Sequence, residues 1–482
     1  MKGMKKMSEH RGYITTLKNV RAHPNADRMK LADCFGNTVC VGLDAQENDV
    51  VIYFPVDGQL SVEYCAKNNL VRRKDENGNN VGGYLDPNKR NICAIKLRGE
   101  KSDGLVMPLE SLAYTGVDMQ TLTIGTTITV INGHEIYQKY IPYHAERSVA
   151  GGAGKRVKRR AKRSIAPLFF EHADTEQLAY NLAAFKPGDE IEITLKMHGT
   201  SQRTGYLPRL NGYKRTFWDK LLRREGEPIY EYGLVDGTRR VVLDSYDGGF
   251  YGSNEFREQH AKKFEGKLWK GETVYYEVVG FTHTGAPIMA SAANSRVNDR
   301  EFTKKYGKET VFSYGCAPYT TEARIEDGEG FYEIPQSDIY VYRMTMTNED
   351  GDVVDYTPDF MRYRCEQMGI KTVPVLYRGF LEAIEQEDGE VKYRLVGKNA
   401  ADVYGFESAG SVVKSVAECF YDGPDPIGKT HIREGVVVRI INRPKFTAYK
   451  HKNFYFKVLE GIIKDSADAP DMEEAQDVIE GE

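Results

Sequence analysis

A single lysine in the middle of the chain stands where chemistry on a phosphate could occur. Lys196 ends the run Ile191–Leu195 and opens the hexapeptide Lys-Met-His-Gly-Thr-Ser. The alternation of apolar and polar residues before it is typical of a β-strand. A lysine at a strand end, beside a glycine turn, can present its amine as a nucleophile toward phosphorus. Because only the neutral amine can attack, burial or neighbouring cations must lower the pKa of such a lysine.

Such a reaction also needs groups that neutralise the phosphate, and the sequence supplies them at the ends of other predicted strands. Glu277 lies in an apolar, β-rich run that reaches a glycine, and Glu434 directly precedes a valine-rich run. Lys450 and Lys452 are two residues apart, so their side chains share one face of a strand. Two neighbouring ammonium groups repel each other unless an anion lies between them, and phosphate is such an anion.

Each of these residues also has an ordinary explanation. Glu277 could be a solvated strand acid and Glu434 a surface acid. Tyr342 could be a core tyrosine, and the two lysines could line an exposed strand face. Chance would have to place all of them in one order along the chain, which favours the functional interpretation.

The elements that must position these residues fall into two predicted regions. The first holds short β-rich runs separated by turn residues, a spacing that favours a small antiparallel barrel over a βαβ array. Its predicted strands are Gly12–Leu17, Met29–Cys34, Thr38–Val41, Val50–Phe54, Ile92–Leu97 and Thr126–Val130. In the second region a predicted helix, Thr175–Phe185, leads into the strand that ends at Lys196.

Composition bounds the class of protein. A chain of 482 residues, 40% hydrophobic and 28% charged, predicts a globular protein with two domains. The seven cysteines are scattered and form no Cys-x-x-Cys pair, which argues against a disulfide framework and a zinc ribbon. We therefore expect a reducing, cytoplasmic location. No apolar stretch has the length of a membrane span, so no membrane association is expected, and no stable protein partner is predicted.

The net charge of −4 hides a strong asymmetry along the chain. Lys155–Arg163 is nearly all basic and follows several glycines, whereas Asp465–Glu482 contains acids but no lysine or arginine. The basic block could track a phosphate backbone or could be an ordinary charged linker, and both interpretations stay open. The acidic tail is predicted to be disordered.

Taken in order, these motifs resemble those of ATP-dependent RNA ligases of the covalent nucleotidyltransferase superfamily. Lys196–Ser201 matches the first motif in its RNA-ligase form, where His198 replaces the aspartate of DNA ligases and capping enzymes. Glu277 resembles the third motif, Glu434 the fourth, and Lys450 with Lys452 the fifth.

Two further segments extend this resemblance. Tyr342 takes the place of the aromatic residue that stacks on adenine, although the acid expected after it is Arg343 here. The segment 237–241 resembles the arginine motif that contacts the ribose or the incoming end, with Arg239 preferred and Arg240 as the alternative.

The resemblance implies a role for each residue. Lys196 would attack the α-phosphate of ATP and carry AMP, while Lys450 and Lys452 would grip that phosphate. Glu277 and Glu434 would bind the nucleotide and a divalent cation, Mg²⁺ or Mn²⁺. The remaining nucleotide-binding residues would be His198, Gly199, Arg239, Arg240 and Tyr342.

The implied partner is RNA with 3'-hydroxyl and 5'-phosphate ends, at a nick or a broken tRNA-like molecule. The N-terminal region resembles the OB domain of the RNA ligase family first described from a radiation-resistant bacterium, in segments 23–28, 50–58 and 95–105. The implied fold is α+β, an OB-like β-barrel followed by a ligase-type nucleotidyltransferase domain of antiparallel sheets with flanking helices. The implied boundaries are 1–135 for the OB-like domain, 136–166 for the linker, 167–464 for the catalytic domain and 465–482 for the tail.

Two alternatives compete with this interpretation. A capping-type guanylyltransferase or a DNA ligase is disfavoured by His198 and by the lack of a second OB-like region after the fifth motif. A non-catalytic RNA-binding protein is disfavoured because a decayed core would have no need to keep its nucleophile.

Overall fold

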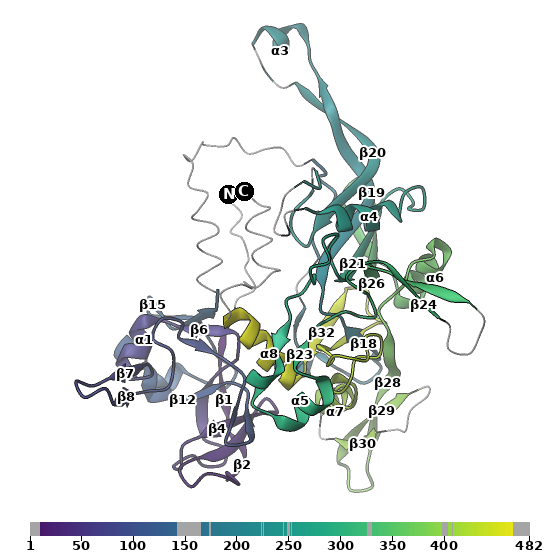
Figure 1. The fold of residues 1–482 in the computed structure, drawn as a ribbon. Coiled ribbons are helices and arrows are strands. Elements are labelled where there is room, and N and C mark those ends of the chain that lie inside the picture. The colour runs from purple at the N-terminus through teal and green to yellow at the C-terminus, as the bar shows by residue number, and fades with distance from the viewer. Residues whose placement is uncertain are drawn as a thin grey trace. The chain divides into compact units, whose positions relative to one another are not determined.

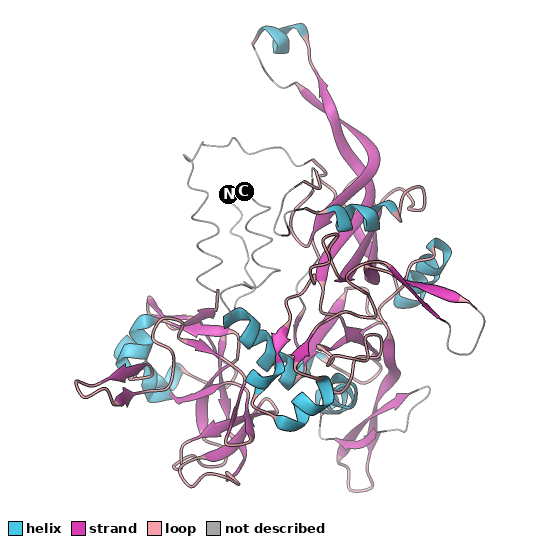
Figure 2. Cartoon of the chain, in the orientation of Figure 1, coloured by secondary structure: helices cyan, strands magenta, loops and turns pink. Residues whose placement is uncertain are grey.

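The structure, a computed structural model, describes residues 10–141 and 165–465, with gaps at 173–174, 223, 225, 244, 248–250, 252, 325–329, 398–402 and 407. The basic block Lys155–Arg163 and the acidic tail beyond Asp465 lie outside the described residues. Strands outnumber helices and pair almost entirely in antiparallel fashion, which confirms the predicted α+β class (Figures 1 and 2).

The chain divides into two compact units. Unit 1 contains Met1–Glu146 together with two later segments, Ala292–Glu309 and Phe454–Pro470. Unit 2 contains Arg147–Ser291, Thr310–Asn453 and Asp471–Glu482. All the candidate site residues belong to unit 2.

Unit 1 is built from short strands. Its elements are β1 (Gly12–Thr16), β2 (Lys18–Ala22), β3 (Lys30–Cys34), β4 (Asn37–Val41), β5 (Val50–Phe54), β6 (Gly58–Leu60), α1 (Val62–Lys67), β7 (Arg72–Lys74), β8 (Asn80–Gly82), β9 (Asn91–Ile92), β10 (Ile95–Leu97), β11 (Glu100–Ser102), β12 (Leu105–Pro108), β13 (Thr127–Ile128), β14 (Val130–Ile131), β15 (His134–Glu135), β16 (Tyr137–Lys139), β22 (Ala292–Ala293), α5 (Arg300–Tyr306) and α8 (Phe454–Asp465). Four of the predicted strands are confirmed, with ends that differ by a residue at most. The other two are each broken into two short strands, Ile92–Leu97 into β9 and β10, and Thr126–Val130 into β13 and β14.

These strands form several small sheets rather than one continuous barrel. The largest has the order β12-β5-β1-β13, and two three-stranded sheets, β2-β3-β4 and β16-β6-β9, accompany it. Among the described residues the pairing does not close into a barrel, so the predicted closed OB barrel is not shown.

Helix α8 is joined to the N-terminal sheets of unit 1 by ion pairs. Lys457 contacts Asp103 at 2.5 Å, and Lys464 contacts Asp57 at 2.5 Å. All four side chains are at least partly buried, so these pairs are screened less than surface pairs are. Helix α8 is thus anchored to the N-terminal sheets of the same unit.

Unit 2 holds two larger sheets with helices beside them. Its elements are β17 (Glu176–Gln177), β18 (Glu190–Lys196), β19 (Thr200–Lys214), α3 (Phe217–Leu221), β20 (Glu227–Thr238), α4 (Glu255–Lys262), β21 (Glu272–Gly280), β24 (Thr321–Arg324), β25 (Phe331–Ile334), β26 (Ser337–Thr347), β27 (Val353–Asp355), α6 (Pro358–Met368), β28 (Val375–Glu385), β29 (Val391–Gly397), β30 (Val403–Phe406), α7 (Ala409–Tyr421), β31 (Gly435–Ile440) and β32 (Thr447–Lys452).

The seven-stranded sheet has the order β17-β32-β31-β18-β28-β29-β30, and the five-stranded sheet has the order β20-β19-β21-β26-β27. Only residues 197–199 separate the end of β18 from the start of β19, so the chain passes from one sheet to the other at the hexapeptide. Lys196 therefore lies at the junction of the two sheets.

Each sheet of unit 2 has one face in an apolar core. Ile191 and Ile193 of β18 pack with Val436 and Val438 of β31 and with apolar residues of α7. Because side chains alternate along a strand, Glu192, Thr194 and Lys196 point to the opposite face. On the five-stranded sheet a second cluster buries alternate residues of β21 and β26. The core pattern of β18 therefore aims the lysine away from the apolar side.

One predicted element is wrong. Residues Thr175–Phe185, expected as a helix, form the short strand β17 and two single 3₁₀ turns, Leu178–Tyr180 and Leu182–Ala184. The Asn181 side chain donates a hydrogen bond to the Gln177 carbonyl, which offers the backbone an alternative to helical bonding.

Within the described part of the chain, no helix has both the length and the apolar content needed to cross a membrane.

Candidate active site

The candidate nucleophile is aligned with one of the predicted phosphate-binding lysines across three neighbouring strands. Lys196 of β18 pairs with Gly435 of β31, and Gly435 pairs with Lys452 of β32. Directly opposed residues in antiparallel strands project to the same face. The side chains of Lys196 and Lys452 therefore lie on one face, two strands apart, with a glycine between them.

Gly435 is required by this arrangement. Its φ is +149°, and a β-carbon there would lie 2.1 Å from the carbonyl oxygen of His451. A side chain would therefore collide with the backbone of β32. Glycine at this position therefore permits the close pairing that places Lys196 and Lys452 on either side of it.

Glu434 is the acid around which the cationic groups gather. One of its oxygens, Oε1, lies 2.8 Å from Lys196 Nζ and 3.6 Å from Lys452 Nζ. The other, Oε2, lies 3.8 Å from His198 Nδ1. The Glu434 side chain is 3% exposed, whereas that of Lys196 is 22% exposed and can be reached from solvent. The structure thus brings the first, fourth and fifth predicted motifs together.

His198 is held by aromatic residues that the sequence did not single out. Its backbone N–H donates to the Tyr314 hydroxyl at 2.6 Å, and its ring meets Phe312 edge to face at 4.5 Å. Tyr314 and Phe312 in turn pack against the His431 ring. Tyr314 is buried and has a φ of +48°, a conformation unusual for an aromatic residue. Burial raises the pKa of Tyr314, so its hydroxyl stays neutral.

Gly199 lets the chain pass close to the neighbouring strand. A β-carbon at this position would lie 2.3 Å from the Val278 carbonyl oxygen of β21. The glycine therefore permits the close pairing in which Ser201 stands opposite Glu277. Glu277 is buried, and its position in the five-stranded sheet places it on the same face as Ser201.

Tyr342 reaches this same row. Its hydroxyl lies 2.9 Å from Ser201 Oγ, so the aromatic residue contacts the last residue of the hexapeptide. Tyr342 stands at a bulge of β26, between Val341, which pairs with Tyr276, and Arg343, which pairs with Tyr275. A bulge re-aims a side chain relative to the regular strand alternation.

The three other predicted residues lie on β32 and in the turn after β20. Lys450 shares its strand face with Lys452 and pairs with Val437. Arg239 and Arg240 form the turn that closes between Thr238 and Val241. The charge of Arg239 is one of those that lower the pKa of His172.

A cluster of arginines and aromatic rings around His172 closes the part of the site next to Tyr342. The His172 ring lies 5.1 Å from the Tyr342 ring and 5.7 Å from the Phe446 ring. The guanidinium groups of Arg343 and Arg439 also stack on the Phe446 ring, with their central carbons 4.8 Å and 4.7 Å from the ring centroid. Because Arg343 belongs to β26 and Arg439 to β31, the facing sides of the two sheets meet at this ring.

The contact between Arg343 and His172 fixes the tautomer of the imidazole. Arg343 lies 3.3 Å from His172 Nδ1, and a guanidinium can only donate, so Nδ1 accepts. Burial, followed by the charges of Arg343 and Arg239, lowers the pKa of His172 well below its usual value. The imidazole is therefore neutral, with its proton on Nε2. Asp355 binds Arg343 through two hydrogen bonds, at 2.6 and 3.1 Å, and keeps it in place.

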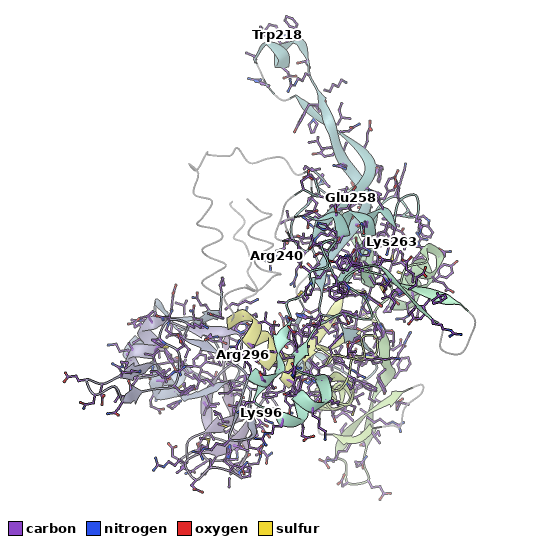
Figure 3. All side chains as sticks on the ribbon, in the orientation of Figure 1. Lys96, Trp218, Arg240, Glu258, Lys263 and Arg296 are labelled. Carbon is purple, nitrogen blue, oxygen red and sulfur yellow. The ribbon has the colours of Figure 1, made fainter. Side chains whose placement is uncertain are left out.

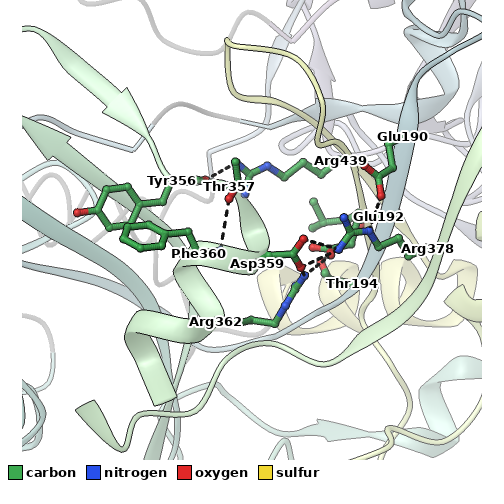
Figure 4. A network of polar contacts seen from close by, with 11 residues as sticks. Glu190, Glu192, Thr194, Tyr356, Thr357, Asp359, Phe360, Arg362, Arg378 and Arg439 are labelled. Atoms are coloured by element: carbon green, nitrogen blue, oxygen red, sulfur yellow. Dashed lines mark hydrogen bonds and ion pairs between the residues drawn. The ribbon is translucent and has the colours of Figure 1, made fainter. Parts of the chain in front are cut away.

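A polar network holds β18 through its acidic side chains (Figure 4). Arg362 of α6 binds Glu192 at 2.9 Å and Asp359 at 2.7 Å. Arg378 of β28 binds Glu190 at 2.7 Å and also contacts Asp359. Since Glu192 is nearly fully buried, its pairing with Arg362 offsets a desolvation cost of several kcal/mol. The strand that carries Lys196 is thus tied to α6 and β28.

The acidic residues of the site suit a cation that is mainly coordinated by its substrate. Glu434 Oε2 is buried and receives no hydrogen bond from the described residues. Within those residues no group of three or more His, Cys, Asp or Glu side chains is arranged to hold a metal. This donor set fits Mg²⁺ or Mn²⁺, which use one or two carboxylates together with phosphate oxygens and water.

Sequence reasoning missed His172, Tyr314, Phe312, Arg439 and Phe446. They are single residues without a periodic pattern, and they become neighbours only when the two sheets pack. Arg203 offered one signal, because it lies on the strand that follows the hexapeptide and shares the face of Ser201. Its guanidinium stacks on Phe169 at 4.4 Å.

Neither a family model nor a curated protein sequence matches the chain. Among solved structures, the chain is similar to Naegleria gruberi RNA ligase. A variant with ATP and Mn has 14% identity and a TM-score of 0.48, with 93% of this chain and 97% of that chain covered. A variant with AMP and Mn has 13% identity, a TM-score of 0.49 and coverages of 92% and 97%. An identity and a TM-score this low carry no functional argument, so the function rests on the geometry of the site.

Proposed function

We propose that the protein is an ATP-dependent RNA ligase that joins 3'-hydroxyl and 5'-phosphate ends through a lysyl-AMP intermediate. The observation that carries this proposal is the convergence of Lys196 and Lys452 on the buried carboxylate of Glu434. Two lysine ammonium groups beside one buried carboxylate form a site for an anion. The negative charge of a phosphate can neutralise the lysines in place of the Glu434 carboxylate. Glu277 and Tyr342 on the facing sheet supply contacts for a ribose and a base.

The reaction follows from these positions. Lys196 Nζ, after losing a proton, attacks the α-phosphorus of ATP, a phosphorus–nitrogen bond forms, and the bond to pyrophosphate breaks. The RNA 5'-phosphate then attacks the lysyl-AMP phosphorus and releases Lys196. Finally the 3'-hydroxyl attacks the 5'-phosphate of the activated end, expels AMP and forms the phosphodiester.

The ion pair with Glu434 opposes the first step, since a protonated amine has no lone pair. Attack requires that the Glu434 carboxylate give up Lys196 as the nucleotide binds. Lys450 and Lys452 would then hold the α-phosphate. Glu434 and Glu277 would hold Mg²⁺ or Mn²⁺, whose charge would offset that of the phosphates.

Recognition of the nucleotide is assigned to Tyr342 and to the cluster of arginines and aromatic rings around His172, which we call the ring cluster. Tyr342 would stack on adenine, and the turn residues Arg239 and Arg240 would contact the ribose or the RNA end, with Arg239 preferred. His198 and Gly199 would shape the turn beside the phosphate. The N-terminal unit would bind RNA, and nick sealing or mending of tRNA-like breaks in the cytoplasm would be the biological setting.

Transfer of label from α-labelled ATP tests this proposal. The protein should retain label after denaturation when incubated with Mg²⁺, and Lys196→Ala should retain none. Equal labelling of Lys196→Ala would show that the nucleophile is misassigned, and a folded wild type without label would overturn the ligase function. GTP in parallel separates ligase from capping enzyme, and nicked duplexes with ribose or deoxyribose 3' ends separate RNA from DNA joining.

A further inference from the structure

Strands β19 and β20 extend far beyond the five-stranded sheet as an isolated ribbon. β19 pairs with β21 only from Thr200 to Gly205, whereas its pairing with β20 continues to Lys214 opposite Glu227. We call residues 208–233 the arm. It carries helix α3 at its outer end (Figures 1 and 2).

Along the arm, β19 pairs with β20 but not with β21. A two-stranded ribbon is marginally stable at best unless its face is covered. Contacts along the arm from outside it include the backbone bond from Leu210 to Ile165 and the stacking of Lys270 on Tyr232. With about seven residues in each strand, the ribbon reaches on the order of 23 Å. An element of this length and limited support is better explained by binding than by folding.

The end of the arm exposes apolar surface. Phe217 is 73% exposed and Trp218 is 66% exposed, and their rings meet edge to face at 5.9 Å (Figure 3). Leu221 and Leu222 are also exposed. Large apolar residues gathered in this way on a surface usually mark an interaction site.

Basic residues flank helix α3, the tip of the arm, on both sides. Lys214 and Arg215 directly precede the tip, and Arg224 follows it, all three with exposed side chains. Aromatic rings that can stack on bases, flanked by cations that contact phosphates, are the combination by which proteins bind single-stranded nucleic acid.

We propose that the arm binds single-stranded RNA, with Phe217 and Trp218 stacking on bases and Lys214, Arg215 and Arg224 contacting the phosphates. This inference rests on the proposed function, since it places part of the ligase's RNA substrate on the arm. Stacking suits a ligase that must accept ends of varied sequence, because every base offers a flat face.

Other partners fit the arm less well. Helix α3 spans only five residues, too few for an amphipathic helix that lies in a lipid surface, and Asp219 in its first turn would face anionic headgroups. The tip's few apolar residues also fall short of a protein interface of about 800 Å² per partner.

The test compares two double variants in the full chain. Phe217→Ala with Trp218→Ala removes the proposed stacking pair, and both side chains are exposed, so folding should not change. Phe331→Ala with Tyr332→Ala removes another exposed aromatic pair, 68% and 54%, from hairpin β24–β25 and serves as the matched control. Thermal unfolding confirms that both variants are folded.

Binding of a 5'-phosphorylated single-stranded RNA is measured by fluorescence anisotropy. We expect the arm variant to bind at least about 30-fold more weakly, since two stacked bases are lost, and the control to bind like wild type. Lys214→Gln with Arg215→Gln should reduce the slope of log affinity against log salt by about 1.4. Unchanged RNA affinity in the arm variant would overturn the inference. An arm variant that loses affinity for phosphatidylserine vesicles but not for RNA would also overturn it.

Self-adenylylation, measured on the same proteins, separates this inference from the proposed function. The arm variant should take up label at the wild-type rate. If wild type takes no label but loses RNA affinity on removal of Phe217 and Trp218, the ligase proposal fails and the arm remains an RNA site. If labelling is normal and RNA affinity is unaffected, the arm inference fails and the ligase proposal stands.

Discussion

Replacing Tyr314 by phenylalanine tests how the hexapeptide is held. The change removes only the hydroxyl that accepts the His198 N–H at 2.6 Å. A donor left without its partner in a partly buried position costs about 1–3 kcal/mol. If that cost falls on the conformation in which Lys196 faces the nucleotide, the competent fraction drops by about 5- to 150-fold.

The assay is the single-turnover rate of AMP transfer to the protein at saturating ATP, with thermal unfolding alongside. Tyr64→Phe is the matched control, because Tyr64 is fully buried in unit 1 and its hydroxyl lies 2.7 Å from Ser111 Oγ. We expect both variants to lose some stability and only Tyr314→Phe to lose rate. A wild-type transfer rate in Tyr314→Phe would refute the assignment of Tyr314 as a positioning residue.

Three further predictions follow from the same contacts. Glu434→Gln keeps the shape but removes the carboxylate charge proposed to hold the divalent cation, so label uptake should fall by about 10- to 150-fold. The change also leaves Lys196 and Lys452 without their shared partner, so the free energy of unfolding should fall by up to about 3 kcal/mol. Gly199→Ala forces a β-carbon against the Val278 carbonyl and should destabilise the protein by about 1–3 kcal/mol in urea unfolding, with loss of labelling. Burial lowers the pKa of His260 to about 3, so the unfolded chain binds more protons between about pH 6.5 and 3. As the pH is lowered through this range, the free energy of unfolding should fall by up to about 1.4 kcal/mol per pH unit. The fall should be less steep in His260→Asn.

The strands that carry the site were predictable because each is either an alternating run or a short apolar, β-rich run. β18, β21, β31 and β32 all lie where alternation or apolar runs placed them. Alternation also predicted that Lys450 and Lys452 share a face, since that follows from strand geometry without knowledge of the partner strands. The assignment of roles to these residues stays a prediction until labelling is measured.

The segment before β18 shows where a local pattern misleads. Leu178, Leu182 and Phe185 have helical spacing, yet the chain breaks into two 3₁₀ turns. Asn181 bonds back to a carbonyl, and Pro187 with Gly188 follows, so the backbone has local alternatives to a helix. Helical spacing in a stretch this short carries little weight against such competition.

The ring cluster could not be predicted for a different reason. His172, Arg343 and Phe446 are far apart in sequence, and each alone is an ordinary residue. The sequence showed Arg343 only as a departure from an expected acid. In the structure its guanidinium fixes the His172 tautomer and shares the Phe446 ring with Arg439, so the departure coincides with a different set of contacts beside Tyr342.

The order of motifs along the chain leaves open the register that brings Lys196, Gly435 and Lys452 into one row. A slip of one residue between β18 and β31 would turn the side chains of one strand to the other face. Val436 and Val438 prevent this slip, because it would move both from the apolar core to the polar side. Each buried methylene lost in that way costs about 0.8 kcal/mol. The same alternation that builds the core therefore sets the positions of the charged groups, and Lys196 cannot shift relative to Glu434 unless the packing of β31 against α7 is lost.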